Sequence, residues 1–261
     1  MKSSRLLRIS GLLVLPLFLI GFITLNPAPE KGRMKSLTHG ETTVDPKAVD
    51  LFRGAMEYLS ELKQFSVQAQ STLEELTYSG HRIDLEISSS VTVSRPNKMH
   101  IERHGLGFGQ IFYYNGKTLT LFNPAEKVYA MEAAPGTIED MFHFARDTYG
   151  LSVPVSDLLY SDAFTLLMQE VNYAALIGKE MIGEVQCYHL LFSRPGVDFQ
   201  IWIADSGHPL VYKYVVCDTA TPELLAFATV MRNWNLAPSV SKTLFEFTPP
   251  EDSEKIIFLE E

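Results

Sequence analysis

Cysteine and positive charge are both scarce in this sequence of 261 residues. Two cysteines are too few for a disulfide framework or for a zinc site made of four thiolates. The 22 Lys and Arg residues are outnumbered by 31 Asp and Glu residues, and a net charge of −9 excludes a nucleic-acid binder. Apolar residues at 46% and charged residues at 20% exclude a disordered chain and a membrane protein with many spans. A globular chain of one large domain or two small ones remains.

The N-terminal residues differ in charge from the rest of the chain. Lys2, Arg5 and Arg8 precede an uncharged apolar stretch at residues 9–25, a pattern typical of a secretory signal or an N-terminal membrane anchor. Both alternatives stay open, because the stretch is long for a signal and short for a membrane span. In either case we expect the rest of the chain to be exported across a membrane, with residues 9–25 as its anchor in that membrane if they are not cleaved.

The remaining chain divides into a linker and one folded domain. Residues 26–44 are rich in Pro, Gly, Lys, Ser and Thr and have no apolar period, so they predict a linker. We therefore expect a signal peptide or anchor at residues 1–25, a linker at residues 26–44, and one folded domain at residues 45–261.

Hydrophobic periodicity predicts an α+β domain. The pair Asp45-Pro46 is typical of a helix start, and apolar residues recur at helical spacing from Val49 to Leu59. Residues 82–94 then alternate apolar and polar side chains, which predicts a strand with one apolar face. Further strands are predicted at residues 67–73, 98–102, 110–114, 118–122, 127–131, 173–182, 185–192, 199–203, 210–216, 225–232 and 243–247. Helical segments are predicted after Thr137 and at residues 156–170, and the short connections favour antiparallel pairing.

Local motifs that suggest chemistry have simpler interpretations. On a strand, His100 and His104 would lie about 13 Å apart, too far for two ligands of one metal ion. Residues 205–208 read Asp-Ser-Gly-His, but triad members must converge from separate elements, and here they share one turn. The expected strand register separates Cys187 from Cys217 by roughly 20 Å, so we expect two free cysteines. We therefore expect no catalytic residue, no metal and no cofactor.

Motifs spread over most of the folded domain resemble one protein family. They are Arg95-Pro96-Asn97-Lys98, Phe112-Tyr113-Tyr114-Asn115-Gly116-Lys117-Thr118-Leu119, Ala134-Pro135-Gly136-Thr137-Ile138, Ser156-Asp157-Leu158-Leu159 and Phe245-Glu246-Phe247-Thr248-Pro249-Pro250. On these residues the chain resembles an uncharacterised family of predicted periplasmic proteins. The Arg-Pro step and the Asn-Gly-Lys hairpin more distantly resemble the outer-membrane lipoprotein carrier and receptor superfamily.

The distant resemblance implies a fold and a function. The fold would be an unclosed antiparallel β-barrel, a strongly curved sheet of about ten to eleven strands with N-terminal and inserted helices over its concave face. Its function would be non-enzymatic binding of a lipid or a lipidated protein in the periplasm, as a carrier or chaperone. The residues expected to line the cavity are Ile83, Leu85, Ile87, Val91, Val93, Met99, Ile101, Leu119, Leu121, Met141, Phe142, Phe199, Ile201 and Ile203. Arg95 is a candidate latch for the helical lid.

Several alternatives to this function remain open. A solidly packed core would give the same alternating apolar pattern as a cavity. A membrane-anchored module that senses envelope stress by binding an envelope protein would carry an exposed apolar patch instead. An uncharacterised hydrolase would need polar groups that converge in a cleft. The expected partner is thus an acyl lipid or lipoprotein, or an envelope protein, and not a nucleic acid.

Overall fold

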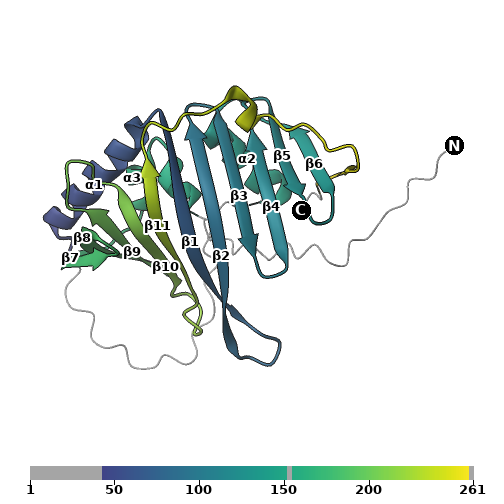
Figure 1. Cartoon of the computed structure of the whole chain (residues 1–261). Helices are drawn as coiled ribbons and strands as arrows, with labels where there is room; N and C mark the ends of the chain where they lie inside the picture. Colours follow the sequence, from purple (N-terminus) through teal and green to yellow (C-terminus); the bar gives the residue numbers. More distant parts are fainter. Residues whose placement is uncertain (1–42, 152–154, 259–261) are drawn as a thin grey trace.

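A computed structural model of the chain describes residues 43–151 and 155–258 (Figure 1). In these residues 12 strands form one sheet in the order β12-β6-β5-β4-β3-β2-β1-β11-β10-β9-β8-β7. The strands are β1 (Gln64–Leu76), β2 (Arg82–Ser94), β3 (Lys98–Gly105), β4 (Phe108–Tyr114), β5 (Thr118–Asn123), β6 (Val128–Ala133), β7 (Tyr173–Ile182), β8 (Val185–Arg194), β9 (Val197–Ala204), β10 (Val211–Asp218), β11 (Ala226–Asn235) and β12 (Glu254–Ile256). The two edge strands β7 and β12 do not pair with each other, so the sheet is unclosed, as the resemblance implies.

The helices lie on one face of this sheet, which we call the inner face, and the sheet curves around them (Figure 1). They are α1 (Pro46–Glu61), α2 (Ile138–Tyr149), α3 (Ala163–Leu167) and the 3-10 turn η1 (Ser156–Leu159). A second 3-10 turn, η2 (Lys242–Phe245), belongs to the C-terminal segment that leads to β12. One apolar core fills most of the space between the inner face and the helices.

The two main helices begin at the residues that the sequence predicts. The Asp45 carboxylate accepts a hydrogen bond from the backbone N–H of Lys47 at 2.9 Å, and the Thr137 hydroxyl accepts one from the backbone N–H of Asp140 at 3.1 Å. These side chains satisfy backbone donors that have no partner inside a helix. Helix α1 then buries one face against the core, with Phe52 fully buried.

The β4–β5 turn also forms as predicted. The Asn115 side-chain oxygen accepts hydrogen bonds from the backbone N–H groups of Lys117 and Thr118 at 3.0 and 2.9 Å. Gly116 has φ 85°, and a Cβ there would lie 2.6 Å from the side-chain nitrogen of Asn97. Only glycine fits this left-handed position without strain.

The C-terminal segment differs from the expected strand at residues 243–247. The Ser241 hydroxyl accepts a hydrogen bond from the backbone N–H of Thr243 at 3.0 Å and starts η2, so the apolar residues follow a 3-10 turn. The last strand is β12 instead, and it pairs in parallel with β6, whereas the other neighbouring pairs are antiparallel. Strand β12 could not be predicted from the sequence, because its three residues are too few to show an alternation of apolar and polar side chains.

Two other expectations concern the cysteines and the membrane segment. Cys187 and Cys217 are both free, as predicted, and Cys187 pairs with Ala204 in the β8–β9 ladder. The expected signal or anchor at residues 9–25 lies outside the described residues. No helix within residues 43–151 and 155–258 is long and apolar enough to cross a membrane.

Candidate functional site

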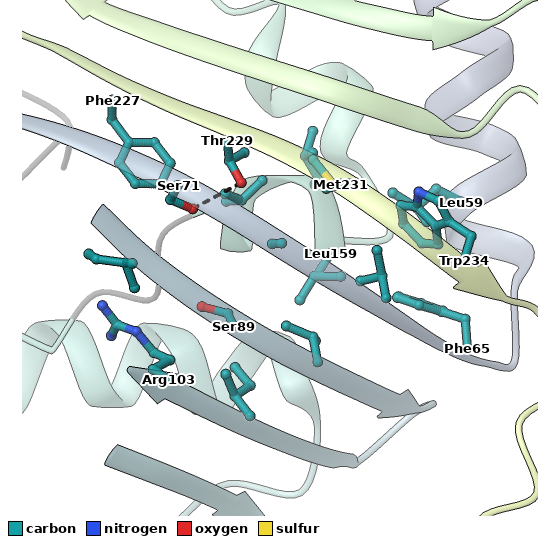
Figure 2. A pocket seen from close by; sticks show the side chains of 17 residues that line it. Leu59, Phe65, Ser71, Ser89, Arg103, Leu159, Phe227, Thr229, Met231 and Trp234 are labelled. Atoms are coloured by element: carbon teal, nitrogen blue, oxygen red, sulfur yellow. Dashed lines mark hydrogen bonds between the residues drawn. The ribbon is translucent and has the colours of Figure 1, made fainter. Parts of the chain in front are cut away.

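An apolar cavity of about 80 Å³ lies on the inner face between four neighbouring strands and two helical elements (Figure 2). The strands are β11, β1, β2 and β3, and the helical elements are α1 and η1. The lining residues are Leu59, Phe65, Val67, Ala69, Ser71, Ile87, Ser89, Val91, Ile101, Arg103, Val155, Leu158, Leu159, Phe227, Thr229, Met231 and Trp234. Most of these side chains are aliphatic or aromatic, so the cavity suits an apolar guest.

Three small side chains form the floor of the cavity. Ala69 lies directly opposite Ser89 in the β1–β2 hairpin, and Ser71 lies two residues further along β1. Directly opposite residues of an antiparallel pair point to the same face of the sheet. Larger side chains such as Phe65 surround these positions but do not fill the space above them.

Two buried hydroxyl groups at the floor, those of Ser71 and Thr229, are paired with each other. The Ser71 hydroxyl donates a hydrogen bond to the Thr229 hydroxyl at 3.0 Å, and both residues are buried (Figure 2). A buried hydroxyl without a partner costs free energy, and this pairing reduces that cost without a ligand. An apolar guest can therefore lie over Ser71 and Thr229 without breaking their hydrogen bond.

One charged side chain stands among the apolar ones. Arg103 is the only ionisable residue among the 17 described residues that line the cavity. It lies opposite Ser89 in the β2–β3 ladder and shares the inward direction of Ile101, two residues before it. Burial lowers the pKa of the Arg103 guanidinium. Its guanidinium carbon lies 5.8 Å from the centre of the Phe108 ring.

The structure distributes the predicted ligand-binding residues over three environments. Ile87, Val91 and Ile101 line the cavity. Leu85 is half-buried, and Ile83 is 41% exposed on the part of the β1–β2 hairpin that extends beyond the sheet. The others belong to the packed core: Val93, Met99, Leu119, Leu121, Met141, Phe142, Phe199, Ile201 and Ile203. Binding of a ligand by any of them stays a prediction.

Arg95, the candidate latch, lies beside the start of α2. Its Nε and Nη2 atoms are buried and have no hydrogen-bond partner in the described part of the chain. Burial lowers the pKa of Arg95, and the Glu139 carboxylate on α2 opposes that shift. The Glu139 carboxylate accepts a hydrogen bond from the backbone N–H of Ser161 at 2.6 Å. The proximity of Arg95 to α2 is compatible with a latch, and the latch itself stays a prediction.

Sequence reasoning missed several residues of the cavity. Ser89 interrupts the apolar alternation between Ile87 and Val91, and this break was a readable sign of a gap on the inner face. The contribution of β11 had no such sign. Ser71 and Thr229 are 158 positions apart in sequence, and no short-range pattern predicts that β1 and β11 are neighbours.

The other motifs do not form a site in the structure. No group of three or more potential metal ligands occurs within residues 43–151 and 155–258. In the turn at residues 205–208, the Ser206 hydroxyl donates to the backbone carbonyl of His208 at 2.9 Å. The His208 ring nitrogen Nδ1 instead lies 2.6 Å from the Tyr58 hydroxyl. Ser206 and His208 therefore lack the hydrogen bond between hydroxyl and imidazole that a nucleophile and its base require.

Comparison with known families identifies the family of this chain. A family model described as "Predicted periplasmic protein (DUF2092)" matches residues 48–259. The chain belongs to this family, which confirms the resemblance found in the sequence and agrees with the expected periplasmic location. No curated protein sequence matches the chain.

Solved structures with a similar arrangement share little sequence with this chain. An uncharacterised conserved protein from Thermus thermophilus is 9% identical with a TM-score of 0.48, covering 81% of this chain and 99% of its own. The Mycobacterium tuberculosis lipoprotein LppX is 14% identical with a TM-score of 0.45, covering 76% and 100%. A LolA superfamily protein from Nitrosomonas europaea is 10% identical with a TM-score of 0.35, covering 77% and 97%. Likenesses at this level identify neither a ligand nor an activity.

Proposed function

We propose that this periplasmic protein binds an acyl chain, of a lipid or of a lipidated protein, in the apolar cavity, as a carrier or chaperone without catalysis. The observation that supports this proposal is the gap above Ala69, Ser71 and Ser89, which is lined mainly by apolar side chains from β11, β1, β2, β3, α1 and η1. Each methylene group that leaves water for such a site contributes about 0.8 kcal/mol. An acyl chain is therefore the guest that the lining favours.

The size of the cavity sets a condition on this proposal. A volume of about 80 Å³ is smaller than an apolar cavity of about 150 Å³ that holds one benzene. It is also below the range of roughly 300–1,000 Å³ typical of ligand pockets. The conformation described here therefore admits only a few carbon atoms, and a longer chain requires lining elements to move.

Element η1 is the part of the lining whose displacement should require the least free energy. It is a single 3-10 turn of four residues, and such turns have poorer hydrogen-bond geometry than an α-helix. Val155, which precedes it, has φ 66°, a conformation that is strained for a β-branched residue. Displacement of Leu158 and Leu159 away from the sheet would extend the cavity along β1 and β2.

A second candidate function is supported by exposed apolar side chains at one end of the sheet. The turns β1–β2, β3–β4 and β10–β11 all lie at this end, and the β1–β2 hairpin projects beyond the other two (Figure 1). Their exposed apolar residues are Leu76, Tyr78, Ile83, Leu106 and Leu224. Exposed apolar patches mark interaction surfaces. They favour a protein-interaction module of the envelope, which can coexist with acyl-chain binding.

Photo-crosslinking inside a bacterial host tests the acyl-chain proposal. The photoreactive residue p-benzoylphenylalanine replaces Phe227, a half-buried lining residue, in one variant and Ser90, an exposed residue of the outer face, in another. We expect ultraviolet light to attach acyl lipid to the position 227 variant and not to the position 90 variant, as seen in the mass of the purified chain. An absence of lipid adducts at position 227, with the protein exported and folded, would contradict the proposal.

A further inference from the structure

We propose that the acyl ligand carries an anionic head group, a carboxylate or a phosphate, and that Arg103 binds this group at the β3 side of the cavity. This inference rests on the proposed acyl-chain function and specifies its ligand class. It is carried by the position of Arg103, by its surroundings and by the absence of a counter-ion in the described part of the chain.

Arg103 stands on β3, which is one of the two outer strands among the four that line the cavity. Figure 2 shows Arg103 on one side and Phe65 and Trp234 on the opposite side. In the ladders, Arg103 lies opposite Ser89, and Phe65 lies opposite Val93. Ser89 and Val93 are four residues apart on β2, which corresponds to roughly 13 Å along the strand. A chain whose head group lies at Arg103 can therefore extend over Ser89 and Ala69 toward Phe65 and Trp234.

The surroundings of Arg103 leave its charge without compensation. In the described part of the chain, no carboxylate pairs with Arg103, and its guanidinium lies over the Phe108 ring instead. Burial alone accounts for its lowered pKa, and no neighbouring carboxylate opposes that shift. An arginine nevertheless stays protonated in a protein. A half-buried cation with no anion beside it is costly, and binding of an anion would relieve that cost.

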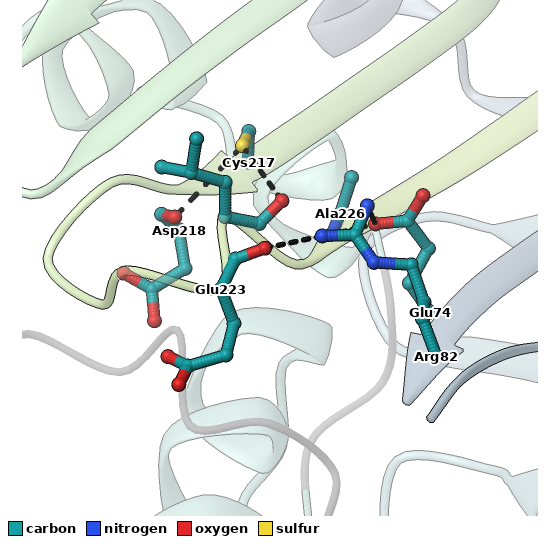
Figure 3. Close-up of polar contacts among 7 residues, drawn as sticks. Glu74, Arg82, Cys217, Asp218, Glu223 and Ala226 are labelled. Atoms are coloured by element: carbon teal, nitrogen blue, oxygen red, sulfur yellow. Dashed lines mark hydrogen bonds and ion pairs between the residues drawn. The ribbon is translucent and has the colours of Figure 1, made fainter. Parts of the chain in front are cut away.

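Two other arginines of the domain, Arg82 and Arg146, each pair with a carboxylate. The Arg82 guanidinium lies 3.4 Å from the Glu74 carboxylate and also donates to the backbone carbonyl of Glu223 (Figure 3). The Arg146 guanidinium lies 2.9 Å from the Asp147 carboxylate. Arg103 differs from both because it faces an apolar cavity instead of solvent and a carboxylate.

The geometry of the guanidinium suits both proposed head groups, a carboxylate and a phosphate. Its donors form a planar fork that can bind two oxygens of a carboxylate or a phosphate at once. A hydroxyl, an ester or an amide offers no negative charge, and an ammonium group would be repelled. We therefore expect discrimination by head-group charge among ligands with the same acyl chain.

Labelling with matched photoreactive ligands tests this discrimination. The full-length chain is reconstituted in vesicles of phosphatidylcholine, which carry no net charge. Three probes share one diazirine-bearing sixteen-carbon chain and differ in the head group: a carboxylate, a phosphate monoester and a neutral alcohol. The yield of label on cavity peptides is measured against probe concentration for the wild type and for Arg103→Gln, Arg103→Lys and Arg82→Gln. Thermal unfolding verifies that each variant is folded.

We expect the wild type to prefer an anionic probe over the alcohol by about tenfold or more, the scale of a hydrogen-bonded charge pair. Arg103→Gln should abolish this preference, Arg103→Lys should retain part of it, and Arg82→Gln should resemble the wild type. The carboxylate and phosphate probes show which of the two head groups is preferred. Equal labelling by all three probes in the wild type, or a full preference in Arg103→Gln, overturns the inference alone. No labelling of the cavity by any probe overturns the proposed function, and the inference with it.

Discussion

The substitution Ser89→Leu tests whether the gap on the inner face exists in solution. Ser89 lies opposite Ala69 on the cavity floor, and none of the hydrogen bonds among described residues involves its side chain. A leucine at this position points into the gap and replaces a small polar group with an apolar one. Binding of an acyl chain requires the same space. The substitution should therefore abolish acyl-chain labelling and leave the fold intact.

The expected effect on stability follows from the cavity volume. The free energy lost to a cavity is about 24 cal/mol per Å³. Complete filling of about 80 Å³ would thus raise the free energy of unfolding by at most about 2 kcal/mol. For a domain of this size, 2 kcal/mol corresponds to an increase in Tm of about 4–8 °C. Incomplete filling gives a smaller increase, and we expect a Tm at or above that of the wild type.

Urea unfolding and calorimetry measure this effect, with Ser90→Leu as the matched control. Ser90 is the neighbouring residue and is exposed on the outer face, so the same change there should alter neither the cavity nor labelling. A closed core would give the opposite result, because insertion of a larger side chain into packed space costs about 1–3 kcal/mol. A loss of stability in that range for Ser89→Leu, with acyl-chain labelling retained, would refute the reasoning.

Two further predictions concern titration and thiol reactivity. Burial raises the pKa of Asp157 in η1, and Arg194 and Arg146 oppose this shift. Because the folded state binds this proton more tightly than the unfolded state, the carboxyl lowers stability as the pH rises through the raised pKa. Asp157→Asn should therefore gain stability relative to the wild type over that interval, as measured by urea unfolding across a pH series. Burial also raises the pKa of the Cys187 thiol to about 11, and this side chain is fully buried. The Cys217 side chain is half-buried, and its thiol donates to the backbone carbonyl of Leu224 (Figure 3). A thiol reagent at neutral pH should thus modify Cys217 first, and unfolding should release the second thiol; equal rates in the folded protein would contradict this.

Much of the fold was predictable because its elements carry local signals. Strand β2 has the predicted bounds, since polar and apolar residues alternate over its whole length. The starts of α1 and α2 were predictable because Asp45 and Thr137 precede them and can accept hydrogen bonds from the first turn. The 3-10 turn at residues 242–245 was missed because a short apolar stretch before two prolines has the same composition as an edge strand.

The candidate site was predictable only in part, because it depends on pairing between distant strands. The alternation of apolar and polar residues in β2 and β3 correctly predicted that Ile87, Val91 and Ile101 point to the inner face. Alternation in β9 also selected Phe199 and Ile201, which lie in the packed core, since alternation reports the direction of a side chain and not the space around it. Strand β11 lines the cavity because it pairs with β1. The two strands are far apart in sequence, so no local sequence pattern predicts this pairing.

The size of inward side chains, rather than their polarity, distinguishes a cavity from a filled core in such a sheet. The β1–β2 turn fixes the register of the hairpin, and this register sets Ala69 opposite Ser89 and Ser71 opposite Ile87. Three small residues thus cluster on a face whose other members are large, and the space above them costs roughly 2 kcal/mol of stability if it stays open. That cost is a substantial part of the roughly 5–15 kcal/mol by which typical domains are stable. Occupation by an acyl chain would recover it, whereas a sheet that served only as a scaffold would gain the same free energy from a single larger side chain at position 89.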